Sequence, residues 1–382
     1  MLYISLYKTV ALIFFVFVLL IIVIYLNFAV FSKFCICVLF ILFLQFPRHS
    51  HWRKIVNLKN RPEFEHSFHE IREVMKNSKA SSTIKNYDYY YRKFQNWCNL
   101  HNFSSLSSST ETVAIYLNSL VQRSVSVSVL YSNYYSIKWY HDLNLHSNPC
   151  DDKLISVFLE GGKRILSKPI IKKDPITPDI LNKIIDMYGK DHSNLKNVRL
   201  CAMLLLGYAG FLRYSEIANL KMENIQFVPS YIVVNIVSGK TDVYRRGNNV
   251  VIAKTNGKAC PVSWFLRYIS LAELRYDSED FIFRAIRYFK SKNVYTLINV
   301  NRSLSYTRAR ELLINCLTVL GLDSSKFCLH SLRSGGTTAA AANNISDRLI
   351  KEHGRWKTDF SRDGFIQDTI SNQLSVSANL GI

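Results

Sequence analysis

The sequence has few acidic residues and lacks the cysteine and histidine patterns that bind zinc. The sequence contains only 28 Asp and Glu residues but 48 Lys and Arg residues, which gives a formal net charge of +20. The eight cysteines are scattered, without a Cys-x-x-Cys pair or a histidine cluster at ligand spacing. We therefore predict no metal site, no cofactor and reduced thiols. The excess positive charge predicts a polyanionic partner, double-stranded DNA in the first place, although RNA and anionic membranes also attract such a chain.

Charge is also absent from the first part of the chain. Residues 9–32 contain no charged side chain, and a second apolar run follows at 34–46. The first run is long enough to span a bilayer. Two interpretations of residues 1–48 stay open. They form a transmembrane helix that anchors the protein to a membrane, or they are translated from upstream sequence and the native protein begins after about residue 50, in the nucleus or cytoplasm.

Residues 68–167 have the pattern of a small, all-helical domain. Apolar residues at helical spacing predict a helix over 84–98. Ser108 and Glu111 have the spacing of a capping box that opens a second helix. Two further helices are predicted over 125–143 and 151–165. The basic residues that fall largely off the apolar stripe of the first helix, and are candidates for DNA binding, are Lys85, Arg92 and Lys93.

A basic, proline-punctuated linker, residues 168–178, separates this domain from residues 179–382. Its candidate phosphate contacts are Lys168, Lys172 and Lys173, and a solvated run of charge is the alternative interpretation. Helical patterns follow at 178–187, 194–210, 261–274 and 305–320. Alternating apolar residues at 231–237 and 250–253 predict strands of a small antiparallel sheet. The predicted fold class is mainly α with a small antiparallel β-sheet (α+β).

The strongest functional signal comes from basic residues that are far apart in the sequence. His330 and Arg333 are three residues apart, so one helix face presents both, and a guanidinium beside an imidazole suits a phosphate oxygen. Arg213 lies at the end of a strongly apolar segment. Lys240 lies between Arg213 and His330 in the sequence, and Trp356 follows Arg333. Together these five residues resemble, in order and type, the catalytic set of the tyrosine recombinase family. That family comprises the phage-integrase and Xer-like enzymes, which cut and rejoin DNA.

The resemblance implies a helical, SAM-like core-binding domain that clamps DNA, followed by a catalytic domain, and a homotetramer assembled on two DNA sites. It assigns Arg213, His330 and Arg333 to the stabilisation of charge on the phosphate during a metal-free transesterification. Trp356 would donate its indole N–H to the same phosphate. Lys240, in a turn between two strands, would protonate the leaving 5′ oxygen.

The family's nucleophile is missing from its place. The resemblance expects a Tyr nine residues after Trp356, where this chain has Phe365, and no Tyr follows Thr307. A phenyl ring has no oxygen with which to attack phosphorus. We therefore predict a protein that binds DNA but cannot cut it unaided. Two alternatives stay open: a Tyr supplied in trans by a partner protomer of different sequence, and a DNA-binding or interaction protein derived from a mobile-element recombinase.

Overall fold

The computed structural model describes residues 65–144, 146–237, 247–368 and 370–382. The chain divides into two compact units, with the boundary between Pro169 and Ile170. The apolar residues 1–48, for which a membrane helix was one interpretation, lie outside the described residues. Within the described ranges, no helix is both long and apolar enough to cross a membrane.

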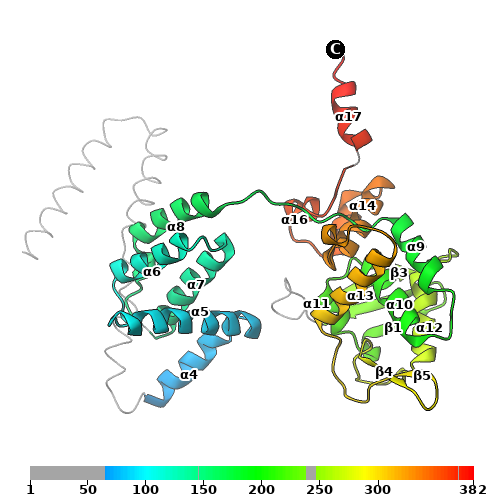
Figure 1. Cartoon of the computed structure of the whole chain (residues 1–382), viewed down its shortest axis with the longest axis horizontal. Helices are drawn as coiled ribbons and strands as arrows, with labels where there is room; N and C mark the ends of the chain where they lie inside the picture. Colours follow the sequence, from blue (N-terminus) through cyan, green and yellow to red (C-terminus); the bar gives the residue numbers. More distant parts are fainter. Residues whose placement is uncertain (1–64, 145, 238–246, 369) are drawn as a thin grey trace, which may run out of the picture. The chain divides into compact units, whose positions relative to one another are not determined.

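The first unit is built from helices. They are α4 (Glu65–Lys76), α5 (Ser81–Leu100), α6 (Thr110–Gln122), α7 (Val127–Leu143), the short 3-10 helix η2 (Pro149–Asp151) and α8 (Lys153–Leu166). Helix α5 packs against α7, and α6 packs against α8 (Figure 1). Tyr91, Phe94 and Cys98 are buried along one side of α5, as the predicted apolar stripe requires. The three basic candidates on this helix, Lys85, Arg92 and Lys93, are exposed.

The start of α6 differs from the prediction by one residue. Ser109, and not Ser108, is the N-cap, because its hydroxyl accepts a hydrogen bond from the backbone N–H of Thr112 at 3.2 Å. Ser108 is buried, and its hydroxyl is 3.2 Å from Nε2 of His141. The predicted capping box was therefore wrong, because the hydroxyl assigned to the cap contacts His141 of α7 instead.

The second unit combines helices with two small antiparallel sheets. Its elements are α9 (Pro178–Tyr188), α10 (Leu195–Ala209), α11 (Tyr214–Ala218), η3 (Met222–Asn224), β1 (Ile225–Val228), β2 (Tyr231–Ile236), β3 (Asn248–Ala253), α12 (Pro261–Leu271), β4 (Ile286–Phe289), β5 (Val294–Leu297), α13 (Tyr306–Val319), η4 (Ser324–Lys326), α14 (His330–Ala342), α15 (Asp347–Gly354), α16 (Asp359–Asp363) and α17 (Ile370–Ala378). The sheet order is β1-β2-β3, with Ile232 opposite Ile252, and β4 pairs with β5. The predicted fold class is confirmed.

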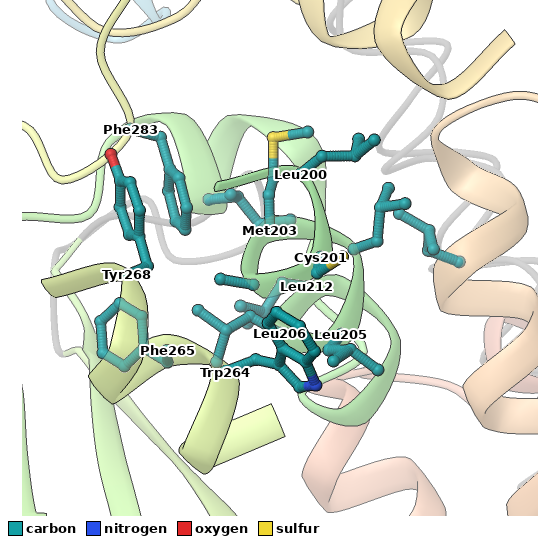
Figure 2. Close-up of a cluster of buried hydrophobic side chains, with 14 of the residues drawn as sticks. Leu200, Cys201, Met203, Leu205, Leu206, Leu212, Trp264, Phe265, Tyr268 and Phe283 are labelled. Carbon is teal, nitrogen blue, oxygen red and sulfur yellow. The ribbon is translucent and has the colours of Figure 1, made fainter. Parts of the chain in front are cut away.

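Helix α10 is the centre of the second unit's core. Its residues from Val198 to Gly207 are all buried, because nearly every position is apolar and α9, α12 and α14 cover it. Figure 2 shows Trp264, Phe265 and Tyr268 of α12 gathered beside the α10 side chains. The ring of Tyr268 stacks on Phe283, with centroids 5.3 Å apart. A rigid α10 fixes where the chain emerges at the functional site.

Two glycines allow α14 to approach its neighbours at backbone distance. A Cβ on Gly335 would lie 1.9 Å from the carbonyl oxygen of Ile176, and one on Gly336 would lie 2.2 Å from that of Tyr208. The backbone N–H of Ile176 also donates to the carbonyl of Ser331, at 2.9 Å. This glycine- and alanine-rich helix therefore packs closely against its neighbours. It holds the start of α14 against both the end of α10 and the linker.

Replacement of Gly335 by Ala should lower the free energy of unfolding of this unit by roughly 1–3 kcal/mol, because the added methyl group meets a backbone oxygen that has little room to move. Gly257→Ala is the matched control, since no atom lies within 4 Å of a Cβ there. Urea unfolding of both variants measures the difference. Equal midpoints for Gly335→Ala and the control would contradict the close approach.

Candidate active site

Arg213 lies at the start of helix α11, where its backbone and side chain are hydrogen-bonded to Glu216. The sequence suggested that Arg213 ends the apolar helix, but α10 stops at Ala209 and Arg213 is the N-cap of the next helix. One carboxylate oxygen of Glu216 accepts from the backbone N–H of Arg213, and the other accepts from its Nη1, both at 2.8 Å. Glu216 thus orients Arg213, as a helix-capping residue in this place should.

Arg355 is a second guanidinium on the same carboxylate. Its Nη2 donates to Glu216 at 2.6 Å and to the carbonyl of Phe211 at 3.1 Å. Its Nη1 donates to the carbonyls of His353 and Gly210, at 2.8 and 3.2 Å. Arg355 has a φ of +58°, in the left-handed region that a residue with a side chain rarely adopts. The many hydrogen bonds of its side chain offset the cost of this conformation.

Arg333 is completely buried on α14. Its Nη1 donates to the carbonyl of Phe211 and its Nη2 to the carbonyl of Gly354. The guanidinium carbon lies 4.2 Å from the centre of the Trp356 ring and 5.2 Å from that of Phe365. Hydrogen bonds to two carbonyls and the faces of two rings hold this cation, and no carboxylate of the described part of the chain is paired with it.

Trp356 and Phe365 form the apolar side of the site. Their ring centres are 5.3 Å apart, and both belong to a small buried cluster with Phe211 and Ile350. A Cβ on Gly354 would lie 1.7 Å from the indole, so only glycine lets Trp356 fold back over this turn. The two aromatic side chains therefore pack against the guanidinium group of Arg333.

The charges of this cluster do not balance. Among the described residues, Arg213, Arg333 and Arg355 face a single carboxylate, that of Glu216. Burial, and then the positive charges of Arg213 and Arg355, lower the pKa of Arg333 to about 9. Among the described residues, buried Nε of Arg333 and Nε1 of Trp356 have no hydrogen-bond partner. A surplus of positive charge beside unused N–H donors is the arrangement that binds an anion.

Comparisons with known proteins find recombinases among the similar proteins. No family model matches the chain. An integrase/recombinase XerD homologue from Selenomonas ruminantium is 26% identical over 292 residues, which cover 75% of this chain and 81% of that protein. A protein of Caldanaerobacter subterraneus subsp. tengcongensis, named as a tyrosine recombinase, is 29% identical over 192 residues, which cover 48% of this chain and 61% of that one.

The chain is thus similar to tyrosine recombinases. Solved recombinase structures share the fold. A λ integrase (75–356) dimer bound to a COC′ core site has a TM-score of 0.50 and 14% identity, and covers 80% of this chain and 96% of that one. The XerH site-specific recombinase bound to its difH substrate has the same TM-score and identity, and covers 76% of both chains.

The structure brings together four of the residues that the family resemblance assigned: Arg213, Arg333, Trp356 and Phe365. His330 begins α14 one turn before Arg333, and its side chain is exposed. Lys240 lies outside the described residues, in the segment between β2 and β3. Of the linker lysines, Lys168 and Lys172 are exposed, whereas Nζ of Lys173 donates to the carbonyl of Ser325.

Two further titratable groups border the cluster. Burial lowers the pKa of His353, and the positive charges of Arg355 and Arg333 lower it further, while its Nε2 lies 2.8 Å from the carbonyl of Ala209. Partial burial opposes ionisation of the Cys328 thiol, but hydrogen bonds from His330 and Ser331 lower its pKa to about 7. Within the described ranges, no three His, Cys, Asp or Glu side chains are grouped so that they could hold a metal ion.

The sequence analysis missed Arg355 and His353, which contribute directly to this site. Both lie next to Trp356 in the sequence, and that proximity was the only available signal. The role of Arg355 depends on a left-handed turn at the end of α15, where a glycine would be the usual residue. Apart from the carbonyl of His353, its partners are carbonyl groups and a carboxylate that are more than a hundred residues away.

Glu216→Gln should lower the free energy of unfolding by about 3 kcal/mol or more, because it leaves buried guanidinium groups without their countercharge. Glu223→Gln is the matched control: this carboxylate is 46% exposed in its pair with Lys221, so the loss should stay below about 1 kcal/mol. Denaturant unfolding at neutral pH compares the two.

The same pair tests the pH dependence. Desolvation raises the pKa of Glu216, but Arg355 and Arg213 outweigh it and hold the pKa below its usual range. The stabilisation is then present above the ordinary carboxyl pKa and is lost as the pH falls through the lowered one. A Glu216→Gln effect that stays constant down to strongly acidic pH would contradict this.

Proposed function

We propose that this protein binds a backbone phosphate of DNA at the cluster of Arg213, Arg333 and Arg355, and that Phe365 stands where the family carries its nucleophilic Tyr. The observation that carries the proposal is the uncompensated positive charge around Trp356 and Phe365. The chain then holds DNA in the manner of a recombinase without forming the covalent bond to it.

The charge surplus favours an anionic ligand over a neutral one. A phosphodiester offers two non-bridging oxygens, which a guanidinium group binds in parallel. Arg213 keeps about a sixth of its side chain exposed, at 17%, so it is reachable from solvent. A phosphate beside Arg333 would stabilise the charged form of that side chain and so raise the pKa that burial has lowered. The indole N–H of Trp356 adds a further donor.

The ring at position 365 explains what the site cannot do. In the covalent step of the family, a tyrosine oxygen attacks phosphorus, the bond to the 5′ oxygen breaks, and that oxygen takes a proton. Lys240 is our candidate proton donor, and His330 is our candidate third phosphate ligand. Phe365 packs against Trp356 and Arg333 but offers no oxygen, so no phosphotyrosyl ester forms.

Basic side chains outside the cluster extend the proposed DNA contact. The net charge of +20 favours association with DNA of any sequence. The exposed residues that we assign to phosphate contacts are Lys85, Arg92 and Lys93 in the first unit and Lys168 and Lys172 in the linker. Nζ of Lys173 donates a hydrogen bond to the carbonyl of Ser325, which holds its positive charge in one position. We also propose that the protein self-associates on DNA, since the λ integrase structure is a dimer on its core site.

Phe365→Tyr should convert the protein into one that forms a covalent adduct with a nicked suicide substrate, whereas the natural protein should form none. The matched control is Phe360→Tyr, which adds the same hydroxyl five residues earlier on a side chain that is 90% exposed. Denaturing gel electrophoresis of labelled DNA detects the adduct. An adduct formed by the natural protein, or none formed by Phe365→Tyr, would refute this proposal.

Arg213→Ala should weaken binding of duplex DNA and reduce the slope of log affinity against log salt concentration by about 1, because one phosphate contact is lost. Arg275→Ala is the control, since that side chain is 79% exposed and paired with Asp277. Fluorescence anisotropy over a series of salt concentrations provides both slopes. An unchanged slope for Arg213→Ala would argue against a phosphate at this residue.

A further inference from the structure

Two hydroxyl groups of α14 hold the backbone of residue 365. Oγ of Ser334 donates to the carbonyl of Phe365 at 2.7 Å, and Oγ1 of Thr338 donates to the same carbonyl at 3.4 Å. Oγ1 of Thr338 also accepts from the backbone N–H of Gln367, at 3.1 Å. One turn of chain around position 365 is therefore attached to a helix by side-chain hydrogen bonds.

These hydroxyls share a helix with the central cation. Ser334 follows Arg333 directly, and Thr338 comes four residues after Ser334, so both project from neighbouring places on α14. The helix that positions the guanidinium of Arg333 thus also positions the backbone that carries the ring of Phe365. Any shift of α14 moves both groups together and preserves their separation.

Few other hydrogen bonds among the described residues fix this stretch of backbone. Helix α16 ends at Asp363 and α17 begins at Ile370, so position 365 lies outside regular helix. The N–H of Phe365 donates to the carbonyl of Arg362 at 2.9 Å and that of Ile366 to the carbonyl of Asp363 at 3.1 Å, but these bonds close a turn and do not connect it to α14. A further attachment is Nε2 of Gln367, which donates to the linker carbonyl of Lys173 at 3.2 Å.

The linker is itself bound to the same region. The N–H of Asp174 donates to the carbonyl of Lys326 at 2.8 Å, and that of Ile176 donates to the carbonyl of Ser331 at 2.9 Å. The side chain of Gln367 is therefore hydrogen-bonded to the linker segment that lies along the start of α14. The segment after position 365 is held on two sides by parts of the second unit.

We infer that Ser334 and Thr338 are positioning residues, which set the place of the side chain at 365 relative to Arg333. The inference rests on the proposed function, since a fixed ring matters for reaction only if that ring stands at the nucleophile's place. A nucleophile must be held close to its line of attack, and a small displacement costs a large factor in rate. The two hydroxyls supply that alignment through the backbone, without touching the DNA.

The test uses the full chain carrying Phe365→Tyr, with Ser334→Ala and Thr338→Val added together. Single-turnover adduct formation at saturating suicide substrate should slow about 10- to 100-fold, while the affinity for DNA stays within about twofold. Ser334→Thr, which keeps a hydroxyl, should restore most of the rate lost in Ser334→Ala. Asn343→Ala is the control on the same helix, because its amide only bonds to the carbonyl of Ala339, and it should not change the rate.

Hydrogen exchange of the Gln367 amide in the otherwise natural protein is the second readout. Thr338→Val removes the acceptor of that N–H, so exchange at Gln367 should quicken while exchange within α14 stays the same. An unchanged exchange rate, or an adduct that forms equally fast with and without the two hydroxyls, would overturn the positioning role alone. Absence of any adduct with Phe365→Tyr would instead overturn the proposed function.

Discussion

The carboxylate of Glu216 lies between two guanidinium groups, and the arrangement of the site depends on this one buried charge. It caps α11, binds Arg213 through one oxygen and Arg355 through the other, and is almost inaccessible to solvent. Without it, three arginines would share a buried space with no countercharge. With it, the cluster is stable but still positively charged, which is the condition for binding a phosphate and remaining folded when the phosphate is absent.

The positions of these charges follow from close backbone packing. Glycines at 335 and 336 let α14 lie directly against the end of α10 and against the linker. The carbonyl of Phe211, at a left-handed residue just after α10, then accepts hydrogen bonds from both Arg333 and Arg355. A single strained residue therefore joins three segments that are far apart in the chain.

Sequence patterns predicted the parts of this structure that depend on local chemistry. The apolar α10, the amphipathic α5 and the start of α9 at Pro178 all follow from sequence patterns, and the structure has them. Order and residue type also indicated which distant side chains belong together, and Arg213 and Arg333 do lie in one cluster. The patterns did not reveal Arg355, because its bonds run to carbonyl groups whose direction depends on the tertiary fold.

The cap of α6 shows the same limit on a smaller scale. The capping-box spacing favoured Ser108, but Ser109 is the N-cap, and the hydroxyl of Ser108 contacts His141 on another helix. The hydroxyls of Ser334 and Thr338 gave no signal either, since serine and threonine after an arginine are common in any helix. Their hydrogen bonds to the carbonyl of Phe365 become evident only in the folded structure, where the turn at position 365 lies beside α14.

The central claim is that the arginine cluster receives a DNA phosphate beside the ring of Phe365. The most direct measurement is an experimental structure of the full chain with a duplex selected from a random pool by its binding to the protein. A phosphate should lie within hydrogen-bonding distance of Nε1 of Trp356 and of the guanidinium group of Arg213, with the ring of Phe365 next to it. A duplex bound elsewhere on the protein, with no phosphate at these side chains, would contradict the account.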